Sequence, residues 1–154
     1  MSHRRVIYTA VFGNKTYMPQ FEVIPNDWDF VYFTDNNELH SDLWKIIYTK
    51  GSNSDPRRSS RYLKLQPHII FPDHEMSVWM DGSLRLTCNI NNLLDVMNVY
   101  DFAGLYHPHE VDGLFHEGER CIKYGKDDPM TIKDQLKSTE AKFHFPKHKS
   151  EFKL

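Results

Sequence analysis

Two short apolar runs near the start of the chain constrain its fold more than any other feature. RVIYTAVFG (residues 5–13) and DWDFVYFTDNN (27–37) are rich in β-branched and aromatic side chains, which are typical of buried strands. LWKIIYT (43–49) and MSVWM (76–80) continue the pattern, and LRLTC (84–88) is a possible short fifth strand. A glycine or an Asp-Asn-Asn cluster closes the first two runs, so both predicted strands lead into loops that can bind a ligand.

Predicted helices alternate with these strands. SDPRRSSRYLKLQPHIIF (54–71) offers Asp55 as an N-cap and Pro56 as a first helical residue, and Pro67 is expected to kink or end the helix. Three further helices are expected, in residues 89–100, 112–125 and 128–141, and another strand is expected in residues 101–108. The alternation predicts an α/β fold with a mostly parallel central sheet flanked by helices, formed by the 154 residues as a single domain, 1–154.

Charge and cysteine content narrow the function classes. The net charge of -2 gives no bulk attraction to nucleic acid or to an anionic membrane. The two cysteines form no disulfide framework and no zinc-type spacing, and no segment approaches the roughly 20 apolar residues of a membrane span. P-loop, GxGxxG, GxSxG and HExxH motifs are absent from the sequence. The expected location is the cytoplasm.

The predicted helix after residue 55 carries a basic face. Arg57, Arg61 and Lys64 are spaced by four and then three residues, so a helix places them side by side, with Arg58 nearby. A solvated helix face is one interpretation. The other is a phosphate site, since guanidinium groups near a helix amino end grip phosphate oxygens bidentately.

Single carboxylates and a histidine follow the predicted strands. Asp81, before Gly82, could ligate Mg²⁺ or Mn²⁺, or the Asp-Gly pair could form a plain turn. Asp35 could accept hydrogen bonds from a ribose or base, or close an Asx-turn. His107 could be a metal ligand or an acid/base group, and Glu117 could face the site; both could also be surface residues.

Four stretches, taken in order, resemble a family of small GT-A-type glycosyltransferases. They are YTAVFGNKTYMP, FVYFTDNN, RRSSRYLKLQPHIIFPDHEMSVWMDGS and HPHEVDGLFHEGERCIKYGKDDP. The family includes bacterial and plant polysaccharide enzymes and chlorella-virus-encoded glycosyltransferases. For a virus-encoded enzyme, the expected cytoplasm is that of the host.

The resemblance implies a GT-A-like (Rossmann-like) domain that binds a UDP-sugar, such as UDP-glucose, with Mn²⁺ or Mg²⁺. Asp81 would be the principal metal ligand in an abbreviated DxD motif, MDGS, and Glu117 a candidate base. The nucleotide-sugar site would comprise Thr9, Ala10, Phe12, Asp35, Arg57, Arg61, Lys64, Asp81, Gly82, Ser83 and His107.

The chain departs from the family pattern at two places. Glu110 stands where a basic residue is usual, and His116 replaces the first of two acids while Glu117 keeps the second. Family members also continue beyond the equivalent of Leu154, so the chain is either a minimal form or a truncated one.

The expected function is therefore metal-dependent transfer of a sugar from a UDP-sugar to a glycan or protein-linked acceptor. Two alternatives stay open. One is a non-catalytic nucleotide-sugar-binding module, and the other is a nucleotidyltransferase.

Overall fold

The computed structural model describes residues 4–51, 54–104 and 113–143. The chain divides into two compact units, residues 1–101 and 102–154, and each is described by itself below. The prediction of a single domain is not tested by this division. None of the helices in the described ranges has the length and apolar character that crossing a bilayer requires.

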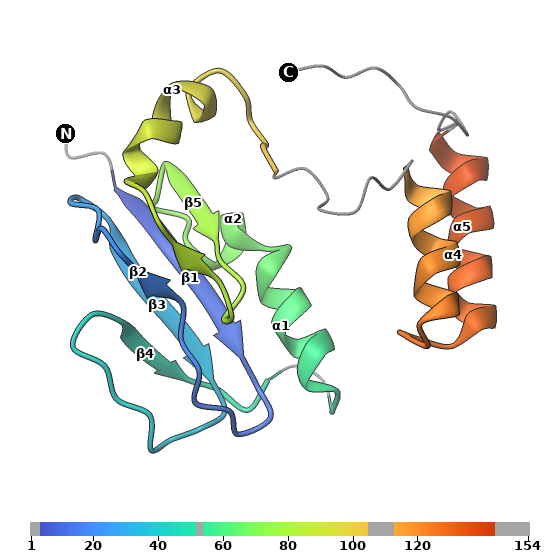
Figure 1. Cartoon of the computed structure of the whole chain (residues 1–154), viewed down its shortest axis with the longest axis horizontal. Coiled ribbons are helices and arrows are strands. Elements are labelled where there is room, and N and C mark those ends of the chain that lie inside the picture. The colour runs from blue at the N-terminus through green and yellow to red at the C-terminus, as the bar shows by residue number, and fades with distance from the viewer. Residues whose placement is uncertain (1–3, 52–53, 105–112, 144–154) are drawn as a thin grey trace. The chain divides into compact units, whose positions relative to one another are not determined.

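The first unit is built on a four-stranded parallel sheet (Figure 1). Its strands are β1 (Arg5–Val11), β3 (Asp29–Thr34), β4 (Lys45–Tyr48) and β5 (Met76–Trp79). The strand order is β4-β3-β1-β5, with every neighbouring pair parallel. The four apolar runs are thus the four strands, and the predicted α/β class with a mostly parallel, Rossmann-like sheet is confirmed.

Both faces of the sheet are buried, because side chains alternate between them along each strand. Ile7 and Val11 of β1 belong to one apolar cluster, which also contains Trp28 and Trp44. The next residues along the strand, such as Tyr8, belong to the second cluster. This two-sided burial explains why the strands read as continuous apolar runs.

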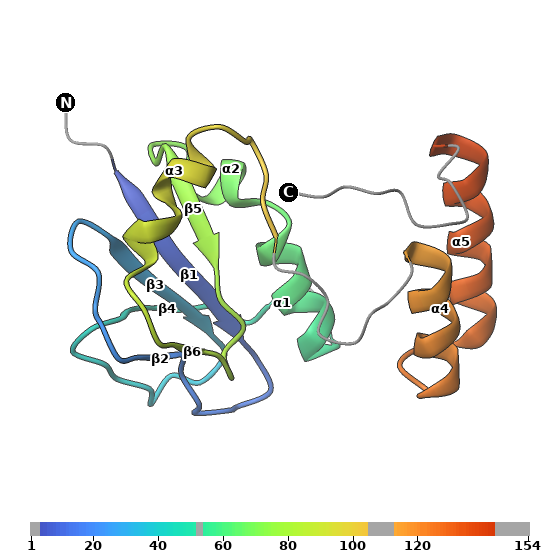
Figure 2. The same ribbon diagram turned by 45° about the horizontal axis from the view of Figure 1, so that its top comes forward.

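Two helices cover the second face (Figures 1 and 2). They are α1 (Pro56–Lys64) and α2 (Pro67–Ile70). The Asp55 carboxylate accepts a hydrogen bond from the backbone N–H of Arg57 at 2.8 Å, so the predicted N-cap is confirmed. α1 ends three residues before Pro67, as predicted.

Shorter elements cover the first face. β2 (Gln20–Phe21), which was not predicted, pairs in parallel with β6 (Arg85–Leu86) as a separate two-stranded sheet. Residues 90–97 form the 3-10 helix η1 (Ile90–Leu93) and α3 (Leu94–Met97), where one longer helix was expected. The strand expected at 101–108 is absent over residues 101–104, and the remainder lies outside the described residues.

The second unit contains α4 (Leu114–Lys123) and α5 (Pro129–Phe143), as predicted. The two helices pack closely at Gly118, where an added Cβ atom would lie 2.6 Å from Leu136 Cδ1. Glu117 belongs to α4 and accepts a hydrogen bond from the Cys121 thiol at 3.6 Å.

Asp29, at the amino end of β3, should make stability depend on acid pH. Hydrogen bonding to His74 Nε2 at 2.9 Å, aided by Arg4, lowers the pKa of Asp29. A carboxylate whose pKa is lowered by folding contributes stability at pH values above its unfolded-state pKa. This contribution is lost as the pH falls through the folded-state pKa. Because the carboxylate is 52% exposed, we expect Asp29→Asn to lose only about 0.5 kcal/mol at pH 7. Thermal unfolding between pH 7 and 3 should show this difference vanishing in acid; a pH-independent difference would contradict the assignment.

Candidate functional site

A cavity of about 300 Å³ lies beside the carboxyl ends of β1 and β5, against α1. The chain runs outward from β1 to β3 and β4, and then returns to place β5 on the other side of β1. Such a reversal of strand order is where open α/β sheets bind ligands. The cavity is lined by Ala10, Val11, Phe12, Lys15, Tyr17, Pro56, Arg57, Ser60, Arg61, Lys64, Trp79 and Asp81.

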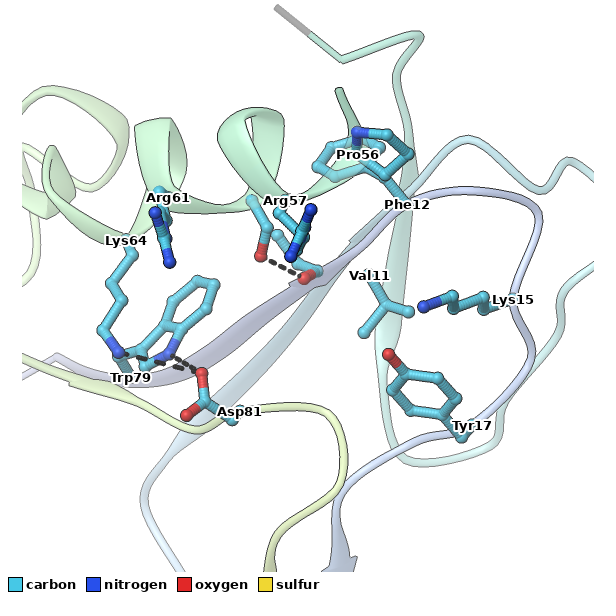
Figure 3. A pocket seen from close by; sticks show the side chains of 12 residues that line it. Val11, Phe12, Lys15, Tyr17, Pro56, Arg57, Arg61, Lys64, Trp79 and Asp81 are labelled. Carbon is cyan, nitrogen blue, oxygen red and sulfur yellow. Dashed lines mark hydrogen bonds and ion pairs between the residues drawn. The ribbon is translucent and has the colours of Figure 1, made fainter. Parts of the chain in front are cut away.

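Most of the charged side chains that line the cavity are basic. Arg57, Arg61 and Lys64 come from one face of α1, as their spacing predicted, and Lys15 comes from the loop after β1 (Figure 3). Asp81 is the one acidic residue that lines the cavity within the described part of the chain. Four cations against one carboxylate make the cavity suited to an anion with several charged oxygens.

Two hydrogen bonds fasten α1 to the sheet. The Ser60 hydroxyl donates to the Ala10 carbonyl at 2.7 Å, and the Tyr8 hydroxyl donates to the Lys64 carbonyl at 3.0 Å. Tyr8 is 1% exposed, and burial raises its pKa to about 12, so it stays a neutral donor at physiological pH. These two hydrogen bonds therefore fix the position of the basic face of α1 relative to the end of β1.

Tyr62, Leu65 and Ile69 recur at helical spacing but do not form the buried face of this segment. Their exposed fractions are 50%, 74% and 63%, whereas Ser59 is 2% exposed. Small serine side chains allow the helix to approach the sheet closely. A search of the sequence for apolar residues at helical spacing does not find such a face.

Gly51 supports α1 from the loop after β4, and we expect Gly51→Ala to destabilise the first unit by about 1–3 kcal/mol. Its φ is +78°, and an added Cβ atom would lie 2.8 Å from Ser59 Oγ. Denaturant unfolding followed by tryptophan fluorescence measures the loss. Gly104→Ala is the control, because a Cβ atom there meets nothing within 4 Å. Equal stability of the two variants would contradict the prediction.

Asp81 is held by two neighbours at the end of β5 (Figure 3). The Trp79 indole N–H donates to Asp81 Oδ1 at 2.8 Å, and Lys64 Nζ lies 3.7 Å from the same oxygen. Lys64 Nζ also lies 5.4 Å from the centre of the Trp79 ring, within the range of a cation–π interaction. Trp79 is held in turn by an edge-on contact with Tyr8, at 5.2 Å between ring centres.

Asp81 also begins a turn, so the two interpretations of the Asp-Gly pair are compatible. The Leu84 N–H donates to the Asp81 carbonyl at 2.9 Å. Gly82 is buried inside this turn, where an added Cβ atom would lie 2.5 Å from Val11 and 2.8 Å from Tyr17. The glycine thus permits close approach to the Tyr17 ring at the edge of the cavity.

The fit of a divalent metal rests on Asp81. No group of three or more His, Cys, Asp or Glu side chains that could hold a metal occurs among the described residues. The Asp81 carboxylate is 60% exposed, and Oδ2 accepts no hydrogen bond from the described chain. Mg²⁺ and Mn²⁺ accept one or two carboxylates when phosphates and water supply the remaining oxygens. The residues therefore fit a metal that Asp81 binds only weakly by itself and that takes its remaining oxygens from a bound phosphate group and water.

The structure brings part of the predicted set together. Ala10, Phe12, Arg57, Arg61, Lys64 and Asp81 all line the cavity. Of the other predicted residues that the structure describes in the first unit, Thr9, Asp35, Gly82 and Ser83 are not among those that line it.

Thr9 is fully buried in β1, and Ser83 is exposed in the turn after Asp81. Asp35 accepts hydrogen bonds from the N–H groups of Gly13 and Asn14 at 2.9 and 3.0 Å, so it shapes the loop after β1. Glu117 belongs to the second unit, and His107 lies outside the described residues.

Six residues that line the cavity are absent from the set predicted from the sequence: Val11, Lys15, Tyr17, Pro56, Ser60 and Trp79. Lys15 and Tyr17 lie in the loop GNKTYMP, which carries no pattern that fixes side-chain direction. Trp79 could have been found, because it precedes Asp81 by two residues on an extended segment and both side chains then share a face.

A comparison with family models finds one match over residues 4–149, described as TOD1/MUCI70, glycosyltransferase-like domain. The match spans most of both compact units. Comparisons with curated proteins and with solved structures give no match.

Proposed function

The chain belongs to the TOD1/MUCI70 glycosyltransferase-like domain family, and from this premise we propose that its cavity binds the diphosphate of a UDP-sugar. The observation that carries the proposal is the set of four cations facing one carboxylate at the carboxyl ends of β1 and β5. A GT-A-like glycosyltransferase needs such a site, because negative charge develops on the departing diphosphate. The choice of uridine comes from the sequence resemblance, as does the expected likeness to virus-encoded enzymes.

Each cavity residue has a role in this proposal. Arg57 and Arg61 bind the phosphate oxygens, and Lys64 and Lys15 supply further positive charge. Asp81, oriented by Trp79, would hold Mn²⁺ or Mg²⁺ together with the diphosphate. A metal bound there would supply positive charge opposite the leaving group.

The sugar is then transferred to a hydroxyl of a glycan or protein-linked acceptor. The bond between the anomeric carbon and the diphosphate oxygen breaks, a bond to the acceptor oxygen forms, and the hydroxyl proton leaves to a base. Glu117 stays the candidate base from sequence, and Asp35, Thr9, Gly82, Ser83 and His107 stay predicted contributors to the donor site.

Calorimetric titration with UDP, CMP and GDP, each with and without Mn²⁺, tests the proposal. We expect UDP to bind best and to bind more tightly with Mn²⁺, and a UDP-sugar then to release UDP in the presence of acceptor glycans. Failure of a folded sample to bind any of the three would overturn the proposal. Tight UDP binding without hydrolysis or transfer would indicate a non-catalytic module, and turnover of a nucleoside triphosphate with a sugar phosphate would indicate a nucleotidyltransferase.

A further inference from the structure

Lys64 differs from the other cations of the cavity in its partner. It contacts the Asp81 carboxylate, at 3.7 Å, whereas Lys15 lies over the Tyr17 ring at 5.6 Å. The Lys64 ammonium therefore stands beside the oxygens that fit a metal. The positive charge of the Lys64 ammonium repels a second cation that approaches Asp81.

The backbone of Lys64 is fixed, while its side chain is partly exposed between Asp81 and the Trp79 ring. Lys64 is the last residue of α1, and its carbonyl accepts the hydrogen bond from Tyr8. Its side chain is 43% exposed and continues the row formed by Arg57 and Arg61. A lysine ammonium on a flexible stem can move between nearby anions without movement of the helix.

We propose that Lys64 is an internal counter-ion of Asp81, which must turn onto the diphosphate before a divalent metal binds the carboxylate. This inference rests on the proposed function. When no nucleotide is bound, Lys64 pairs with the carboxylate and weakens metal binding. A bound diphosphate offers the ammonium a more negative partner, so metal and nucleotide bind together, and metal alone binds poorly.

The test measures Mn²⁺ affinity without nucleotide, by electron paramagnetic resonance of free Mn²⁺. We expect Lys64→Met to bind Mn²⁺ about two- to fivefold more tightly than the unmodified protein, the modest gain expected from removing a partly exposed ion pair. The matched control is Lys15→Met, which removes the same charge from the same cavity without touching Asp81. It should give a distinctly smaller gain.

UDP affinity supplies a second readout with the opposite sign. Lys64→Met should bind UDP about tenfold more weakly, because the ammonium is lost as a phosphate partner. A variant that only damages the local structure would bind both Mn²⁺ and UDP more weakly. Unchanged or weaker Mn²⁺ binding by Lys64→Met, or an equal gain in Lys15→Met, would overturn the inference.

Asp81→Asn separates failure of this inference from failure of the proposed function. If Asp81→Asn loses Mn²⁺ while Lys64→Met gains nothing, the counter-ion role is wrong and the metal site stands. If Asp81→Asn binds Mn²⁺ as the unmodified protein does, the assignment of the metal to Asp81 is itself wrong, and the counter-ion role falls with it.

Discussion

Replacing Arg57 and Arg61 together by glutamine is expected to weaken UDP binding by about 100-fold. Both side chains leave the same face of α1 toward the end of β1, where the cavity lies (Figure 3). A hydrogen bond to a charged group contributes roughly 1.5–3 kcal/mol, which is about tenfold or more in affinity for each arginine. We take the lower end for each because the cavity is open to solvent and its charges are partly screened.

Arg58→Gln is the matched control for this pair. Arg58 lies on the same helix with the same charge but does not line the cavity, and it pairs with Asp55 at 3.9 Å. We expect its loss to change UDP affinity by less than about twofold, since an exposed, screened charge acts weakly at a distance. A loss of binding free energy in Arg58→Gln half as large as that in the double variant would mean that net charge alone attracts the nucleotide, because the control removes one charge and the double variant two. No loss in the double variant would place the phosphates away from α1.

The architecture of the first unit was largely predictable because its strands are buried on both faces. Burial of this kind produces uninterrupted apolar runs, which end at Gly13 after β1 and at Asp35 after β3. β2 was not predictable, since two residues carry no periodicity and its pairing with β6 depends on contacts across 65 positions of the chain. The prediction of one helix over residues 89–100 was wrong for a similar reason, because tertiary context decides between one long helix and two shorter ones.

The candidate site was predictable where backbone geometry alone fixes a side chain. Helical spacing put Arg57, Arg61 and Lys64 on one face, and the end of a strand placed Asp81 at the edge of the sheet. The candidate site was not predictable where contacts between loops decide the direction of a side chain. Asp35 follows its strand as expected, but its carboxylate turns to the N–H groups of the neighbouring loop.

Asp81→Asn is expected to change UDP affinity in opposite directions with and without metal. With Mn²⁺, the variant should lose about tenfold or more, because it lacks the carboxylate that would hold the metal and because the metal would supply the largest charge opposite the phosphates. Without metal, UDP should bind slightly better, since a negative charge is removed beside the phosphates and Lys64 is released. Asparagine keeps an oxygen for the Trp79 N–H, so the local fold is retained.

The crossing of these two effects distinguishes a metal ligand from a structural carboxylate. A structural lesion lowers affinity in both conditions, and a purely repulsive carboxylate raises it in both when removed. Asp55→Asn is the control, because asparagine is an equally good N-cap and Asp55 does not line the cavity. Its UDP affinity should change by less than about twofold with and without Mn²⁺, because the contact between Asp55 and Arg57, at 3.9 Å, is exposed and weak. If Asp81→Asn keeps the full gain from Mn²⁺, the metal is bound elsewhere and the diphosphate must be neutralised at this cavity by the basic residues alone.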